Sequence, residues 1–232
     1  MAAPMTPRSR IHPRALRSTA LLCALVAGFG VAPWAAAEAP ADLVDLQAVD
    51  PTIQLDIRYA TGDNFAGEAV YPVARCLLRR PVAEALARAQ EGLRERGLGL
   101  LVWDCYRPFR VQQRFWELVP DERYVARPAT DEQGRPVEGS RHNRGAAVDL
   151  TLVDGEGREL AMPTGYDDFS TRAYRTSLDA APQQRANSLL LEEVLAAEGF
   201  TPLATEWWHF DGPGWPAYGL LDVPLDAPPP GS

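Results

Sequence analysis

The chain has 232 residues, with 23 basic and 31 acidic side chains and a formal net charge of −8 at pH 7. An acidic chain of this kind has no general electrostatic affinity for nucleic acid, so we exclude nucleic acid as a partner. The sequence contains no lysine, which excludes a lysine nucleophile and Schiff-base chemistry.

The first 37 residues have the pattern of a secretory signal peptide. Four arginines and no acid precede an apolar run over residues 20–32, and the alanines at residues 35–37 supply a cleavage site. The alternative is a membrane anchor, but a span needs about 20 apolar residues, and Pro33 ends this run sooner. We therefore expect a signal peptide over residues 1–37, export to the periplasm and no stable membrane insertion after cleavage.

The rest of the chain has the size of one domain. We predict this domain over residues 38–223 and a proline-rich tail over residues 224–232. Export would place Cys76 and Cys105 in an oxidising compartment, which favours a disulfide between them. The alternative is two buried thiols that pack as small hydrophobic groups.

Hydrophobic periodicity predicts the elements of the first half of this domain. Residues 44–58 alternate loosely and contain β-branched side chains, which is typical of short strands or an extended segment. A proline at its start, hydrophobic residues on one face and a closing glycine predict a helix over residues 81–96. A buried strand over residues 98–103 and a second helix over residues 109–119 follow.

The second half contains two expected loops, one strand and one helix. Residues 121–141 are polar and contain several prolines and glycines, so we expect a long loop that could cover a cleft. A strand is predicted over residues 147–153, a second loop over 162–175 and a helix over 184–198. Because strands and helices do not alternate regularly, the sequence predicts an α+β fold with a central antiparallel or mixed sheet and helices packed to one side.

Two segments contain the residue types of a metal site, and the first spans residues 140–149. It places His142 and Asp149 on either side of a turn containing Gly145, which leads into a predicted strand. A carboxylate combined with imidazoles suits Zn²⁺. The alternative is a surface histidine and an aspartate that only satisfies backbone groups, and for this pair alone both interpretations stay open.

The second segment is Glu206-Trp-Trp-His209. Residues three apart share a face on a helical turn but lie on opposite faces of a strand, so both can serve one metal only if the strand begins or bulges between them. The two tryptophans would exclude water and strengthen the electrostatics of the site. The alternative is an aromatic core segment with a capping glutamate, and only the combination with the first segment favours a metal site.

The chemistry of a hydrolytic zinc site suggests a role for each carboxylate. Such a site needs three protein ligands, an open position for water and a base that takes the proton of that water. Glu206 fits the role of base better than Asp149, because Asp149 is embedded in the histidine-containing turn. Arg107 is the candidate for stabilising an oxyanion, and the alternative for it is a surface or helix-capping arginine.

The two segments form a joint pattern over residues 140–149 and 206–209. Two further stretches accompany it, residues 59–65 (Tyr-Ala-Thr-Gly-Asp-Asn-Phe) and residues 103–108 (Trp-Asp-Cys-Tyr-Arg-Pro). Together with the double tryptophan, this combination resembles the zinc D-alanyl-D-alanine dipeptidases, the VanX-type branch of the peptidases that share a fold with the Hedgehog signalling domain. The matches run from about residue 56 to residue 210.

The resemblance implies an enzyme that hydrolyses D-Ala-D-Ala to two D-alanines with one Zn²⁺ per chain. It implies that the metal is held by His142, Asp149 and His209. Glu206 would be the catalytic base and Arg107 the stabiliser of the transition state. One departure is Cys105, where related cytoplasmic enzymes commonly have glycine.

The resemblance also implies contacts to a small dipeptide substrate. Tyr59 and Ser140 would line the dipeptide pocket. An acid would pair with the free amino group of the substrate, and the family register favours Asp167 over the adjacent Asp168. A small pocket that binds both charged ends would reject longer peptides, because burying an unpaired charge is costly.

Two other functions are compatible with the sequence. A D,D- or L,D-carboxypeptidase of the same fold would need an open cleft, and the loops over residues 121–141 and 162–175 should decide between the two shapes. A non-catalytic module that binds cell-wall peptides would usually lack the base or the arginine. Glu206 and Arg107 are both present, which favours an enzyme.

Overall fold

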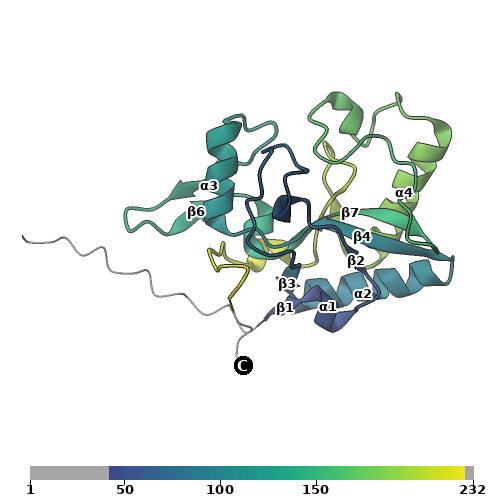
Figure 1. The fold of residues 1–232 in the computed structure, drawn as a ribbon, viewed down its shortest axis with the longest axis horizontal. Coiled ribbons are helices and arrows are strands. Elements are labelled where there is room, and N and C mark those ends of the chain that lie inside the picture. Colours follow the sequence, from purple (N-terminus) through teal and green to yellow (C-terminus); the bar gives the residue numbers. More distant parts are fainter. Residues whose placement is uncertain (1–41, 228–232) are drawn as a thin grey trace, which may run out of the picture. The chain divides into compact units, whose positions relative to one another are not determined.

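A five-stranded mixed sheet is the centre of the computed structural model, which describes residues 42–227 (Figure 1). In spatial order its strands are β2 (Gln54–Leu55), β4 (Leu98–Asp104), β7 (Ala147–Asp154), β9 (His209–Asp211) and β8 (Thr201–Pro202). β2 runs parallel to β4, and the other pairings in this sheet are antiparallel. The predicted α+β class with a mixed central sheet is therefore confirmed.

Helices and short strands surround the central sheet. The α-helices are α1 (Leu46–Val49), α2 (Arg80–Arg94), α3 (Phe109–Leu118) and α4 (Pro182–Ala197). Two smaller sheets pair β1 (Leu43–Asp45) with β3 (Leu77–Arg79), and β5 (Ala129–Thr130) with β6 (Pro136–Glu138). The predicted helices and the two long predicted strands are confirmed to within two residues at each end.

Two local predictions were incomplete. Residues 44–58 contain the short helix α1 between β1 and β2, because the side chain of Asp45 accepts a hydrogen bond from the backbone N–H of Gln47 and caps the turn. The expected loop over residues 121–141 contains the β5–β6 hairpin. Both elements are too short to give a hydrophobic period.

One face of the central sheet is hydrophobic. Side chains alternate along a strand, and the register pairs Leu100 with Leu152 and Val102 with Leu150, all four 0% exposed. Helix α2 packs against this face, and α4 contacts α2, β7 and β8. These contacts form the core, and the ribbon shows α2 running beneath the central strands (Figure 1).

The opposite face of the sheet carries polar residues. Asp149 of β7 and His209 of β9 are direct partners in the register, so their side chains lie on the same face. A bulge between Val102 and Asp104 breaks the alternation of β4 and places Asp104 opposite Asp149. Three neighbouring strands therefore contribute acidic or imidazole groups to one area.

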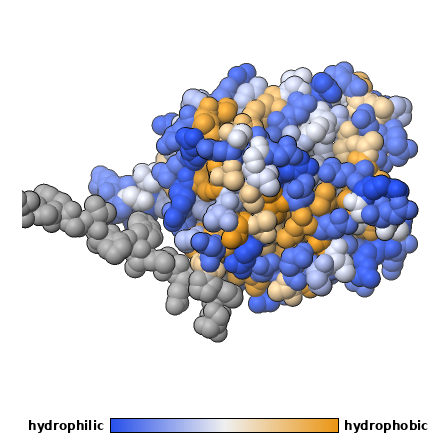
Figure 2. All heavy atoms as spheres, viewed as in Figure 1, coloured by the Kyte–Doolittle hydropathy of each residue, from blue (hydrophilic) through white to orange (hydrophobic). Residues whose placement is uncertain are grey.

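The two expected loops meet beside this polar face. Tyr124, in the first loop, stacks on Phe169 of the second, with ring centroids 4.9 Å apart and planes 20° from parallel. On the face of the molecule seen in Figure 2, hydrophobic residues gather toward the middle and hydrophilic residues cover the edges. The loops are thus packed segments joined by aromatic contacts.

The two ends of the chain were predicted to be a signal peptide and a tail. The signal segment, residues 1–37, lies outside the described residues, as do residues 228–232 of the tail. Packing continues beyond residue 223, because Leu225 is 1% exposed and Arg75 donates hydrogen bonds to the carbonyls of Leu225 and Ala227. No helix between residues 42 and 227 has the length and apolar character needed to cross a membrane.

Candidate active site

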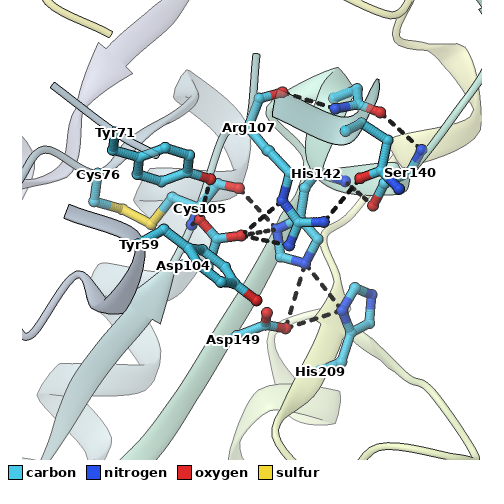
Figure 3. A network of polar contacts seen from close by, with 12 residues as sticks. Tyr59, Tyr71, Cys76, Asp104, Cys105, Arg107, Ser140, His142, Asp149 and His209 are labelled. Carbon is cyan, nitrogen blue, oxygen red and sulfur yellow. Dashed lines mark hydrogen bonds and ion pairs between the residues drawn. A yellow bond between two sulfur atoms is a disulfide. The ribbon is translucent and has the colours of Figure 1, made fainter. Parts of the chain in front are cut away.

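Three buried side chains from separate elements converge on the polar face. His142 lies in the 3₁₀ helix η2 (Arg141–Arg144), Asp149 in β7, and His209 at the start of β9. His142 Nε2 and His209 Nδ1 are 3.1 Å apart, and Asp149 Oδ1 lies 3.3 Å and 3.0 Å from them (Figure 3). A tetrahedral Zn²⁺ with bonds of about 2.0–2.1 Å would hold its ligand atoms about 3.3 Å apart. The three atoms therefore fit a single metal ion.

A rigid turn places His142. The hydroxyl of Ser140 accepts a hydrogen bond from the His142 N–H, and the side chain of Asn143 accepts one from the Ser140 N–H, which together form a capping box. Gly145 ends the turn with φ +67°, and a Cβ there would lie 2.8 Å from Leu43 Cδ1. Only glycine fits both the backbone conformation and the space.

The two histidines are held by groups behind them. His142 Nδ1 lies 2.7 Å from the carbonyl oxygen of Cys105, so Nδ1 carries the proton and Nε2 faces the metal position. His209 Nε2 lies 3.1 Å from Asp211 Oδ1, and Asp211 forms an ion pair of 3.1 Å with Arg141. These contacts fix the orientation of both rings.

Glu206 lies in the turn before β9, with Oε2 3.9 Å from His209 Nδ1. The strand begins at His209, which meets the condition that lets residues three apart serve one site. Burial raises the pKa of the Glu206 carboxyl, which suits a group that must accept and return a proton near neutral pH. Trp207 and Trp208 are both buried, and Trp208 lines the same cavity as Glu206.

Arg107 is a fixed, buried cation and not a surface residue. It is 8% exposed, and its Nη2 and Nε donate to Asp104 Oδ2 at 2.7 Å and 3.2 Å. Nη1 donates to Gln112 Oε1 at 2.8 Å, and Tyr71 donates to the other oxygen of Asp104 (Figure 3). Burial acts to lower the pKa of the guanidinium, but the charge of Asp104 outweighs it and the pKa is raised. Arg107 therefore stays charged.

Tyr59 and Asp167 form another polar group in the cavity. The Tyr59 hydroxyl lies 3.1 Å from each carboxyl oxygen of Asp167. Burial, and then the nearby charge of Asp149, raise the pKa of Asp167 to about 8. Asp167 also has φ 56°, a strained conformation for a residue with a Cβ. Asp168 instead accepts a hydrogen bond from the Ser170 N–H and does not line this cavity.

All the predicted catalytic, metal and substrate residues line one cavity of about 380 Å³. Its charged and polar wall consists of Tyr59, Arg107, Ser140, His142, Asp149, Asp167, Glu206 and His209. Phe65, Phe115 and Trp208 supply much of the apolar wall, and Tyr124 and Phe169 belong to the rim where the two loops meet. The tertiary structure thus brings together segments that are more than 140 residues apart in the sequence.

Cys76 and Cys105 are joined by a disulfide, with their Cα atoms 5.2 Å apart (Figure 3). Cys76 directly precedes β3, and Cys105 directly follows β4. Because the carbonyl of Cys105 also contacts His142, the disulfide anchors the backbone that supports this histidine.

Sequence reasoning missed four residues of the site, namely Asp104, Gln112, Tyr166 and Asp211. Asp211 had a usable signal, because it follows His209 by two positions on a strand and so shares its face. Asp104 faces the site only through the bulge in β4, which no local pattern indicated. Gln112 and Tyr166 reach the site through loop and helix packing.

Comparison with known proteins identifies relatives that cover most of the chain. The family model described as D-ala-D-ala dipeptidase matches residues 39–224. A D-alanyl-D-alanine dipeptidase of Escherichia coli is 37% identical over 180 residues, which is 78% of this chain and 89% of the relative. The protein of that name in Streptomyces coelicolor is 37% identical over 171 residues, 68% of this chain and 85% of the relative. The one in Enterococcus faecalis is 33% identical over 185 residues, 74% and 88% respectively.

Proposed function

Because the chain belongs to the D-ala-D-ala dipeptidase family, we propose that it is a zinc-dependent enzyme that hydrolyses free D-alanyl-D-alanine to two D-alanines. One observation carries the proposal. The metal triad and the buried carboxyl of Asp167 line the same cavity, so one small peptide can present its carbonyl to the first and its ammonium group to the second.

The donor atoms of the triad support zinc as the metal. His142 and His209 supply two imidazole nitrogens and Asp149 one carboxylate oxygen, a set that suits Zn²⁺ better than the oxygen-rich sites of Mg²⁺ or Ca²⁺. Three protein ligands leave a position free for water or substrate. When bound, Zn²⁺ would polarise the peptide carbonyl and make water a stronger nucleophile.

Glu206 and Arg107 would carry out the remaining chemistry. Glu206 takes the proton of the attacking water and returns it to the departing amine of the second alanine. Arg107 stabilises the negative charge that develops on the attacked carbonyl oxygen. Because Asp104 and Gln112 already hold the guanidinium in place, little reorganisation is needed as that charge forms.

Asp167 and Tyr59 would select the free amino group of the substrate. A buried carboxylate is costly without a partner, and a substrate ammonium group supplies one. Ser140 lines the same cavity, although its hydroxyl also caps the turn that holds His142. The contact between Tyr124 and Phe169 at the rim supports a short substrate over a long peptidoglycan stem.

A panel of peptides tests this proposal. We expect turnover of D-Ala-D-Ala, loss of activity with a chelator and recovery with Zn²⁺. The other three alanine stereoisomers, N-acetyl-D-Ala-D-Ala and a pentapeptide stem ending in D-Ala-D-Ala should be poor substrates, because they alter the geometry or remove the ammonium contact. Cleavage of the stem with none of the dipeptide would indicate a carboxypeptidase. Full zinc occupancy without cleavage of any peptide would indicate a binding module.

We also propose that the enzyme is exported and acts in the periplasm. The pattern of residues 1–37 and the Cys76–Cys105 disulfide support this location, because disulfides persist in oxidising compartments. An exported enzyme would use D-Ala-D-Ala released from the cell wall and so recycle D-alanine. Cell fractionation with N-terminal sequencing should find a periplasmic chain that begins at Glu38, and an uncleaved cytoplasmic chain would contradict the proposal.

A further inference from the structure

The two carboxylate oxygens of Asp149 have different surroundings. Oδ1 faces the histidines, 3.0 Å from His209 Nδ1 and 3.3 Å from His142 Nε2. Oδ2 accepts a hydrogen bond of 2.8 Å from the hydroxyl of Tyr166. One oxygen therefore belongs to the metal position, and the other is held by a residue that none of the roles above uses.

The packing of Tyr166 keeps its hydroxyl at this place. Its ring centroid lies 5.0 Å from that of Trp103, 5.7 Å from that of Trp208 and 6.0 Å from that of Tyr59. Aromatic rings from a strand, a turn and a loop thus surround it. The ring cannot swing away from Asp149 without disturbing several aromatic contacts.

We propose that Tyr166 is a positioning residue that restrains Asp149 to a single oxygen at the metal. A carboxylate has two oxygens that can act as acceptors or ligands, and the hydrogen bond from Tyr166 keeps Oδ2 engaged. Without this bond Asp149 could turn and offer both oxygens to the metal. That arrangement would fill the position that a hydrolytic zinc site keeps open. The inference rests on the proposed function, because it assumes a hydrolytic metal at the triad.

The same hydroxyl also connects the metal site with the proposed amino-group site. Tyr166 Oη lies 3.2 Å from Tyr59 Oη, and Tyr59 contacts Asp167. Tyr166 touches the ligand Asp149 directly but reaches Asp167 only through Tyr59. Removal of its hydroxyl should therefore lower kcat more than it raises KM.

The variant Tyr166→Phe tests the role of this hydroxyl, because it removes one oxygen and keeps the aromatic ring. Competition with a chromophoric chelator should show a zinc affinity about tenfold to a hundredfold lower, the usual effect of losing a partner of a metal ligand. The Co²⁺-loaded variant should absorb visible light more weakly than the native protein, as expected for a higher coordination number. Native zinc affinity together with a native Co²⁺ spectrum would overturn the proposal.

Two matched variants separate the hydroxyl of Tyr166 from general effects. Tyr59→Phe removes the neighbouring hydroxyl but leaves the contact with Asp149, so we expect native zinc affinity and a raised KM. Tyr174→Phe changes a half-exposed tyrosine outside the cavity and should leave both quantities unchanged. If Tyr59→Phe lowered the zinc affinity as much as Tyr166→Phe, the effect would belong to the aromatic cluster and the proposal would be wrong.

Thermal unfolding of the metal-free proteins completes the test. Tyr166→Phe and Tyr59→Phe should melt at the same temperature, since both keep their ring contacts. A lower midpoint for Tyr166→Phe alone would assign its hydroxyl a structural role and overturn the proposal. Zinc affinity and the Co²⁺ spectrum need no turnover, so they judge Tyr166 even if the peptide panel overturned the proposed activity.

Discussion

The two faces of the central sheet use the same strands for different purposes. In β7, Val148, Leu150 and Leu152 point into the hydrophobic core, and the alternating Asp149 and Thr151 point to the polar face. The first set stabilises the fold by removing apolar surface from water. The second set includes a metal-binding group whose burial is unfavourable unless it is paired. Substitutions on the two faces should therefore change different measurable quantities.

The largest effect is expected on the polar side, from Glu206→Gln. We expect kcat/KM to fall by about a hundredfold to ten-thousandfold, because glutamine cannot accept the proton of the attacking water. Zinc content and the thermal midpoint should stay close to native, since the shape of the side chain is kept. Steady-state hydrolysis of D-Ala-D-Ala and metal analysis measure both. A native rate in the zinc-loaded variant would contradict the mechanism.

On the hydrophobic face, Leu150→Ala should lower the free energy of unfolding by about 2–5 kcal/mol, through lost burial and the cavity left behind. Leu150 is fully buried beneath the helical layer. Urea unfolding measures the loss, and kcat per folded molecule should not change. The control is Leu189→Ala, at a leucine of α4 that is 63% exposed, which should stay within about 0.5 kcal/mol of native. A lower kcat for folded Leu150→Ala would show that the two faces are coupled.

A smaller effect is expected from Asp211→Asn. Asparagine keeps the shape but loses the charge that supports His209 from behind, so zinc affinity should fall by about tenfold to a hundredfold. Chelator competition measures this affinity. Asp222→Asn is a matched control, because Asp222 pairs with Arg110 away from the cavity and should leave zinc affinity unchanged. Equal affinities for the two variants would remove Asp211 from the support of the metal site.

The smallest effect is expected from Thr151→Val, on the polar face next to the metal ligands. The hydroxyl of Thr151 is buried and has no hydrogen-bond partner within residues 42–227. Valine has the same shape without the unpaired polar atom, so stability should stay equal or rise by about 1 kcal/mol, with unchanged kcat. Denaturant unfolding decides the outcome, and a clear destabilisation would show that the hydroxyl is satisfied by ordered water.

Much of the fold was predictable because its main elements are long enough to show a period. Helices α2, α3 and α4 and strands β4 and β7 each span at least seven residues, so their apolar residues repeat several times. Helix α1 and the β5–β6 hairpin have at most four residues per element. They depend on a cap and on pairing, which leave little trace in local hydrophobicity.

The sequence by itself determined which side chains are available for chemistry and how they are held locally. His142 and Asp149 around Gly145, and Glu206 before His209, are short-range patterns whose residue types already favoured a hydrolytic metal site. Gly145 was readable for the same reason, because a left-handed turn needs a residue without a Cβ.

The tertiary structure alone decided how these segments meet. Strand register brings Asp149 beside His209, the bulge in β4 directs Asp104 toward Arg107, and aromatic packing sets Tyr166 against one oxygen of Asp149. These are contacts between residues far apart in the chain, and their energies depend on the packing of the whole domain. A local pattern gives the type of each residue, but the atom that each one faces depends on that packing.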